Sequence, residues 1–233
     1  MTMVLLSGGL DSAVLLSIVG QTDEITPVHV RCGYAWELAE AHYIDRLLLS
    51  GGIMARFKPL QIIHVDMRDV LPAGHWALTG IAPAYATADE AVYLDGRNIT
   101  LLSKAAVLAS KLKIKKIAMG LLKGNPFPDA TPTFLTAMSR ALTLGLAHDI
   151  QIQTPLSEWT KVDVVKEGKR IALPFDLTLS CMGPIGGQHC GRCSKCRERH
   201  EAFVQAGVPD LTNYTTREMI DGPVKKSGRA KPN

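Results

Sequence analysis

The sequence predicts an α/β protein built on a doubly wound, mostly parallel sheet of five strands. Short segments rich in valine and isoleucine alternate along the chain with longer segments whose apolar residues recur at helical spacing. Hydrophobic side chains make up 46% of the 233 residues, which is enough for a full core. Two glycines follow the first apolar segment and lead into the first helix, where parallel sheets bind ligands.

The expected elements follow one another in a regular order. The first strand, residues 3–6, is followed by a helix over 11–19 that Gly20 closes, then by a strand at 25–30. The later elements are a helix at 35–49, a strand at 60–65, a helix at 99–112, a strand at 116–119, a helix at 133–146, a strand at 150–154 and a helix at 160–171. Residues 67–95 are predicted to form a long loop with one short helix, a length that is often functional.

Composition divides the chain into three regions: an α/β domain at 1–172, a cysteine-rich segment at 173–221 and a flexible basic tail at 222–233. The tail has no acidic residue and four basic ones, namely Lys225, Lys226, Arg229 and Lys231. Without them the body carries 22 basic and 22 acidic side chains, so we do not expect a nucleic-acid partner.

The sequence shows no sign of membrane insertion. No apolar run approaches the about 18 residues of a membrane span, and the first residues lack the basic region of a signal peptide. We therefore expect a cytoplasmic protein without a membrane partner. The sequence leaves a homodimer open.

The stretch SGGLDS predicts a phosphate-binding loop. Gly8 and Gly9 can adopt backbone angles closed to other residues and let an anion approach. The helix N-terminus adds partial positive charge, and Ser7 and Ser12 add hydroxyl donors. The stretch is no Walker A loop, because it lacks the lysine. The alternative is a turn that only joins the strand to the helix.

SGGLDS resembles the PP-loop of the ATP-pyrophosphatase superfamily. The resemblance implies that the loop holds the β- and γ-phosphates of ATP while a substrate oxygen attacks the α-phosphorus and diphosphate leaves. It also implies an adenine-nucleotide alpha-hydrolase-like fold. Asp11 would help to place ATP with its Mg²⁺ ion. The nucleotide-binding residues would be Leu6, Ser7, Gly8, Gly9, Leu10, Asp11 and Ser12.

A cluster of four cysteines predicts a metal centre. Within 16 residues the chain places Cys181, Cys190, Cys193 and Cys196. Four thiolates suit tetrahedral Zn²⁺ in a structural site, while an iron–sulfur cluster or a redox pair stays open. His189 and His200 are expected to be bystanders. We expect the metal to keep this poorly apolar segment folded and to dock it against the substrate pocket.

Together with SGGLDS, the stretch SCMGPIGGQHCGRCSKCRERHEAF resembles the QueC family of 7-cyano-7-deazaguanine synthases. The resemblance spans nearly the whole chain. It also includes, in order, Gly96-Arg97-Asn98, Phe127-Pro128-Asp129, Thr154-Pro155-Leu156 and Lys161.

The resemblance implies an ATP-dependent carbon–nitrogen ligase that turns the carboxylate of 7-carboxy-7-deazaguanine into a nitrile with ammonia and two ATP. Its cofactors would be ATP, Mg²⁺ and Zn²⁺. Asp11, Lys161 and Arg97 would act in catalysis. Arg97, Asn98 and Asp129 would bind the substrate. Each has a plainer reading: a surface pair or a helix N-terminal contact for Arg97, a helix cap for Asn98, a turn or cap residue for Asp129 and a solvated lysine for Lys161.

The chain departs from the family pattern at several pocket positions. Cys32-Gly33-Tyr34 stands where Tyr-Gly-Gln is common, Phe127 replaces a tyrosine, Lys123-Gly124-Asn125 replaces a more acidic stretch, and Asp95 replaces a proline. Several alternatives therefore stay open: a divergent relative or another PP-loop ligase that makes an amide from another carboxylate, a tRNA thiolase, and a non-catalytic nucleotide- and zinc-binding scaffold.

Overall fold

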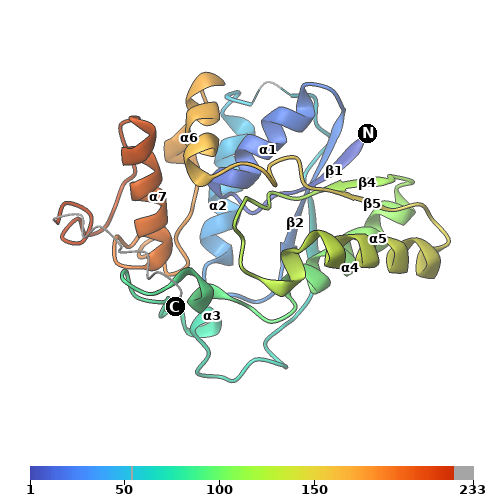
Figure 1. The fold of residues 1–233 in the computed structure, drawn as a ribbon, viewed down its shortest axis with the longest axis horizontal. Helices are drawn as coiled ribbons and strands as arrows, with labels where there is room; N and C mark the ends of the chain where they lie inside the picture. Colours follow the sequence, from blue (N-terminus) through green and yellow to red (C-terminus); the bar gives the residue numbers. More distant parts are fainter. Residues whose placement is uncertain (54, 223–233) are drawn as a thin grey trace, which may run out of the picture.

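The computed structural model describes residues 1–53 and 55–222, and within them the five strands of the sheet all run parallel (Figure 1). Their order is β3-β2-β1-β4-β5. The strands are β1 (Thr2–Leu5), β2 (Ile25–Arg31), β3 (Gln61–His64), β4 (Lys116–Ala118) and β5 (Gln151–Gln153). The predicted fold class is confirmed. The predicted basic tail lies, apart from Gly222, outside the described residues.

Helices cover both faces of the sheet (Figure 1). One face carries α1 (Leu10–Gly20), α2 (Glu37–Leu49) and α6 (Lys161–Arg170), and α7 (Ser194–Ala206) packs against α6 on the same side. The other carries α4 (Arg97–Lys111) and α5 (Pro132–Leu146). The short helix α3 (Trp76–Thr79) and the 3-10 turns η1 (Asp89–Val92), η2 (Pro128–Ala130) and η3 (Phe175–Leu177) lie in the connections.

Alternation along the strands divides the core into two clusters. In β1, Val4 packs with α1, α2 and α6, whereas Met3 packs with α4 on the opposite face. Successive side chains of a strand point to opposite faces, so one short apolar strand supplies both clusters. The burial of β1 on both faces explains why its sequence is a continuous hydrophobic run.

Helix α7 is the element that the sequence analysis missed. All helices and strands for which the sequence analysis gives bounds begin and end within two residues of those bounds. The long loop at 67–95 contains α3, as expected, and also η1. Segment 173–221 also contributes to the hydrophobic core, which its composition does not indicate. Leu177 and Phe203 belong to the same core cluster as α1 and α6.

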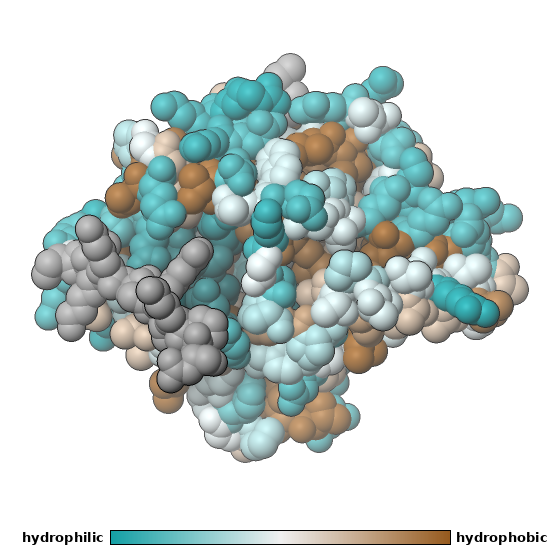
Figure 2. Space-filling view, in the orientation of Figure 1, coloured by the Kyte–Doolittle hydropathy of each residue, from teal (hydrophilic) through white to brown (hydrophobic). Residues whose placement is uncertain are grey.

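The hydropathy of the surface is consistent with a core of apolar side chains beneath a polar exterior. The face shown in Figure 2 is mostly hydrophilic, and its hydrophobic side chains form separate patches. Among the described helices, none is both long and apolar enough to cross a membrane.

Candidate active site

A central cavity opens at the carboxyl ends of β1, β2 and β4. Its volume is about 290 Å³. The glycine loop, the first turn of α4, the first residue of α6 and the side of α7 all face it. Of the residues predicted to act on ATP or substrate, the lining includes Leu6, Ser7, Gly9, Leu10, Asp11, Ser12, Arg97, Asn98, Asp129 and Lys161. Residues more than 150 positions apart in the sequence thus meet in one cavity.

The glycine loop is held in place by its own hydrogen bonds. The Ser12 hydroxyl group donates to the Gly9 carbonyl at 3.0 Å, and the Gly9 amide donates to Ser7 Oγ at 3.3 Å. No side chain caps the amides at the start of α1, so this helix end is suited to an anion.

Gly8 differs from the rest of the predicted loop, because it does not line the cavity. It has a φ of +73°, which a side chain would strain. A Cβ atom there would lie 3.1 Å from Ile44 Cγ1 and 3.2 Å from the Glu40 carbonyl oxygen. Gly8 therefore lets the loop pack closely on α2.

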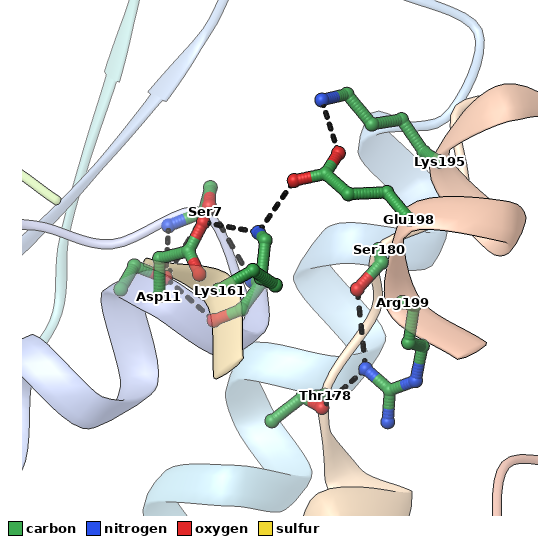
Figure 3. A network of polar contacts seen from close by, with 10 residues as sticks. Ser7, Asp11, Lys161, Thr178, Ser180, Lys195, Glu198 and Arg199 are labelled. Carbon is green, nitrogen blue, oxygen red and sulfur yellow. Dashed lines mark hydrogen bonds and ion pairs between the residues drawn. The ribbon is translucent and has the colours of Figure 1, made fainter. Parts of the chain in front are cut away.

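A chain of ion pairs connects α1, α6 and α7 (Figure 3). Lys161 Nζ lies 2.6 Å from Asp11 Oδ2 and 3.3 Å from Glu198 Oε1, and Lys195 Nζ lies 2.5 Å from Glu198 Oε2. Burial lowers the pKa of Lys161, but the two carboxylates outweigh it and raise the pKa overall. Lys161 is therefore no solvated lysine but a half-buried cation at the cavity wall.

The two acidic residues of this ion-pair network, Glu198 and Asp11, differ in their surroundings. Burial raises the pKa of Glu198, but Lys161 and Lys195 outweigh it and lower the pKa to about 2. Asp11 Oδ1 is buried and has no hydrogen-bond partner among the described residues. Because a buried carboxylate oxygen without a partner is costly, Asp11 is suited to a Mg²⁺ ion that accompanies ATP.

The start of α4 corrects one reading of the sequence. The helix begins at Arg97, so Asn98 is not its cap. Instead the Asn98 amide donates to Asp129 Oδ2 at 2.8 Å, and Asn98 Nδ2 donates to the Asp129 carbonyl oxygen at 3.0 Å. Asp129 is 4% exposed and thus caps a helix that begins 32 residues before it.

Arg97 forms no ion pair among the described residues. Its Nε atom is buried and has no hydrogen-bond partner there. It is therefore a cation whose planar fork is suited to a carboxylate or phosphate in the cavity.

The sequence analysis missed a buried carboxyl group in the same cavity. Glu40 of α2 is 9% exposed and lines the cavity. Burial raises its pKa to about 8, against the effect of Arg97. A signal was present, because Glu40 falls among the positions that α2 buries, next to Tyr43, Ile44 and Leu47.

The turn before α2 is fixed by a neighbouring acid. The Glu37 carboxylate accepts hydrogen bonds from the Cys32 amide and, at 3.0 Å, from the Gly33 amide. Cys32 is 1% exposed and directly follows β2, and burial raises the pKa of its thiol to about 11.

The four clustered cysteines form a site that can hold a metal ion. All four are buried, and their sulfur atoms lie within 4.8 Å of one another. The amides of Gly183 and Cys190 donate to Cys181 Sγ, and that of Arg192 donates to Cys190 Sγ, each at 3.4 Å. Such donors stabilise the thiolates that a metal requires. His189 and His200 bond instead to the Ser180 amide and to Asp210.

Arg199 joins this centre to the rest of the molecule (Figure 3). It is 1% exposed and donates to Thr178 Oγ1 at 2.9 Å, Ser180 Oγ at 3.1 Å and the Phe175 carbonyl oxygen at 2.8 Å. Between Thr178 and Ser180, the Leu179 amide donates to the Gly8 carbonyl at 2.8 Å. The segment that leads into the metal centre therefore bonds directly to the glycine loop.

Comparison with known proteins agrees with this arrangement. The family described as "Queuosine biosynthesis protein QueC" matches residues 1–207. The chain belongs to the QueC family. The resemblance expected from the sequence is thereby confirmed.

Relatives of the QueC family support the assignment over nearly the full length. The 7-cyano-7-deazaguanine synthase of Anaeromyxobacter dehalogenans is 33% identical over 230 residues, with 91% of this chain and 94% of that protein covered. The enzyme of the same name from Methanoculleus marisnigri is 30% identical over 221 residues, covering 90% and 96%.

A solved structure shares the fold. The U34-tRNA thiolase NcsA from Methanococcus maripaludis, solved with its [4Fe-4S] cluster, has a TM-score of 0.50 and is 13% identical, covering 97% of this chain and 77% of that one. At this identity the likeness concerns the fold alone.

Proposed function

We propose that this chain is an ATP-dependent carbon–nitrogen ligase that converts 7-carboxy-7-deazaguanine into 7-cyano-7-deazaguanine with ammonia. Family membership and the named relatives support the proposal. The structural observation that carries it is one cavity that combines the glycine loop, the Asp11–Lys161 pair and the unpaired Arg97.

The chemistry requires activation by adenylation. A carboxylate is a poor acyl donor because its leaving group would be oxide. Attack of a carboxylate oxygen on the α-phosphorus of ATP expels diphosphate and gives an acyl adenylate. Ammonia then displaces AMP and leaves the amide. The amide oxygen attacks a second ATP, and loss of the second AMP leaves the nitrile.

Each lining residue then has a role that suits its surroundings. The amides of the glycine loop and the hydroxyl groups of Ser7 and Ser12 bind the outgoing diphosphate. Asp11 holds Mg²⁺, which neutralises phosphate charge when ATP is bound. Lys161 neutralises negative charge on phosphate, and Arg97 binds the substrate carboxylate through two N–H groups. Asn98 and Asp129, which bond to each other at the start of α4, line the part of the wall that would face the purine-like ring.

Zinc is the metal that we propose for the cysteine centre. Three of the six sulfur–sulfur distances are 3.6 to 3.9 Å, and all four sulfur atoms lie within 4.8 Å of one another. A tetrahedron with Zn–S bonds of about 2.3 Å requires about 3.8 Å. An iron–sulfur cluster would stand between the thiolates and hold them farther apart. Because these thiols must stay reduced, we also propose a cytoplasmic location. The homodimer stays a prediction.

One assay tests the proposed function. The purified protein is incubated with ATP, Mg²⁺, ammonium and 7-carboxy-7-deazaguanine, and products are identified by mass. Nitrile with two AMP per molecule is expected. Amide without nitrile would favour an amide-forming ligase, and no AMP with any carboxylate would favour the scaffold.

A further inference from the structure

The acidic side chains of the central cavity differ in whether they already have a partner. Asp11 and Glu198 are paired with Lys161, and Asp129 is occupied at the start of α4. Glu40 is the exception, because its carboxyl group forms no ion pair among the described residues although it is nine-tenths buried in the cavity wall. Because burial of a carboxyl group without a counter-ion costs free energy, Glu40 is a candidate for a functional role.

The proposed reaction requires a proton acceptor beside the nitrogen atom that ammonia supplies. When ammonia attacks the acyl adenylate, the C–N bond forms, the C–O bond to AMP breaks, and AMP leaves with its electron pair. The nitrogen must then lose one proton. After the amide oxygen has been adenylated, the same nitrogen must lose two more protons while the second AMP departs. Three proton transfers from one nitrogen thus require an acceptor beside it.

We propose that Glu40 is this acceptor and binds ammonia next to the acyl adenylate, an inference that rests on the proposed ligase function. Its backbone lies against Gly8 of the glycine loop, so α2 brings it beside the phosphate site. Arg97, which holds the substrate carboxylate in the proposed function, lines the same cavity, and its positive charge lowers the pKa of Glu40. The carboxylate accepts N–H hydrogen bonds from ammonia, takes each proton on an Oε atom and releases it to water.

The groups around Glu40 favour a proton acceptor that works near neutral pH. Burial is the largest influence on its pKa and raises it to about 8. Arg97 of α4 and the Trp36 side chain lower this pKa, whereas Glu37 raises it. The Cys32 thiol at the end of β2 is also close, and burial keeps that thiol protonated. Glu40 can therefore both take and release a proton in this pH range.

The other candidates in the cavity are poor acceptors. Glu198 has a pKa of about 2, and Lys161 is protonated. His29 has its Nδ1 atom 3.0 Å from the Leu6 carbonyl oxygen, and burial lowers its pKa, so it holds a proton weakly.

Two measurements on the full-length protein separate adenylation from proton transfer. Carboxylate-dependent exchange of labelled diphosphate into ATP reports adenylation, and amide plus nitrile formation reports the steps at nitrogen. In Glu40→Gln we expect exchange within about twofold of wild type and product formation reduced about 100-fold or more. Glu40→Asp should recover part of the loss. Asp45→Asn, an exposed acid on the same helix, is the matched control and should leave both rates unchanged.

The pH profile gives a second readout, measured at a constant concentration of free ammonia. Wild-type product formation should rise with pH through a midpoint near 8, and Glu40→Gln should lack this rise. A Glu40→Gln variant with the wild-type rate and profile would overturn the inference, and so would a parallel loss of exchange. Absence of exchange in the wild type would instead overturn the proposed function.

The pH dependence of stability tests whether the Glu40 carboxyl group is buried and binds a proton near pH 8. A pKa raised by folding means that, as pH rises from the unfolded pKa to about 8, the unfolded state loses the proton first and folding weakens. Replacement by glutamine removes this penalty. The melting temperature of Glu40→Gln relative to wild type should therefore be higher at pH 8 than at pH 5. A relative decrease with rising pH would contradict the buried, proton-binding carboxyl group.

Discussion

At the scale of single residues, Asp11 is the side chain on which phosphate chemistry depends most. Its Oδ2 atom pairs with Lys161, and its buried Oδ1 atom is free for a cation. Asp11→Asn keeps the shape but removes the charge, so we expect AMP release to fall about 100-fold or more. Product nucleotides are measured by chromatography, and the zinc content of the cysteine centre should be unchanged. A variant that released AMP at the wild-type rate would exclude the assigned role.

Arg97 tests how the substrate carboxylate is held. Lysine in its place keeps the charge but loses the planar fork and one of the two parallel hydrogen bonds. Loss of a hydrogen bond between charged groups, about 1.5–3 kcal/mol, should raise the KM for the carboxylate about 10- to 100-fold. The KM for ATP should stay within about twofold. Arg140→Lys, at an exposed arginine of α5, is the control. Equal changes in both KM values would count against carboxylate binding by Arg97.

Sequence patterns reveal some of these residues and not others, for physical reasons. Asp11 and Lys161 belong to local motifs at helix starts, so their position follows from nearby residues. The pairing of Asn98 with Asp129 cannot be predicted from nearby residues, because Asp129 lies 31 residues farther along the chain. Helical spacing places Glu40 on the buried face of α2, but only the packing of α2 against the glycine loop brings Glu40 to the cavity, and that packing is not visible in the local sequence.

At the scale of elements, the first turn of α6 positions Lys161. Thr160 and Asp163 form a reciprocal capping box, in which Thr160 Oγ1 accepts from the Asp163 amide at 3.2 Å. Thr160→Ala should cost about 1 kcal/mol and lower the melting temperature by about 2–4 °C. Because Lys161 is the next residue, kcat should fall as well.

Thr131→Ala is the matched control for this prediction. Thr131 caps α5 in the same way, at 3.2 Å from the Phe134 amide, but α5 contributes no lining residue to the central cavity. We expect a similar loss of stability and a smaller change in kcat. Equal changes in kcat would mean that the α6 cap acts only through stability.

Helix α7 shows why one element escaped prediction while the others did not. Strands and helices of the α/β region bury apolar residues, so periodicity reveals them. The buried face of α7 consists of Ser194, Cys196, Arg199, Ala202 and Phe203. Cys196 of the four-cysteine centre and Arg199, with its four hydrogen-bond acceptors, occupy positions that apolar residues would take in an ordinary amphipathic helix, so the hydrophobic period is lost.

At the scale of the whole molecule, the metal centre and the phosphate site are mechanically connected. The Leu179–Gly8 hydrogen bond and the Arg199 contacts join them. Removal of the metal by a chelator should lower the melting temperature by about 10 °C or more and weaken ATP binding. Calorimetry and nucleotide titration measure both effects. Cys190→Ser should reproduce them, whereas Cys32→Ser should keep the metal. Unchanged ATP affinity after metal loss would refute the connection.

The account as a whole depends on transfer of oxygen from the substrate to the nucleotide. The most direct measurement uses a substrate with ¹⁸O in both carboxylate oxygens and mass analysis of the products. Two adenylations predict that each AMP carries one labelled oxygen and that the nitrile forms with release of diphosphate. Unlabelled AMP, or ADP with orthophosphate, would contradict attack of the substrate on the α-phosphorus.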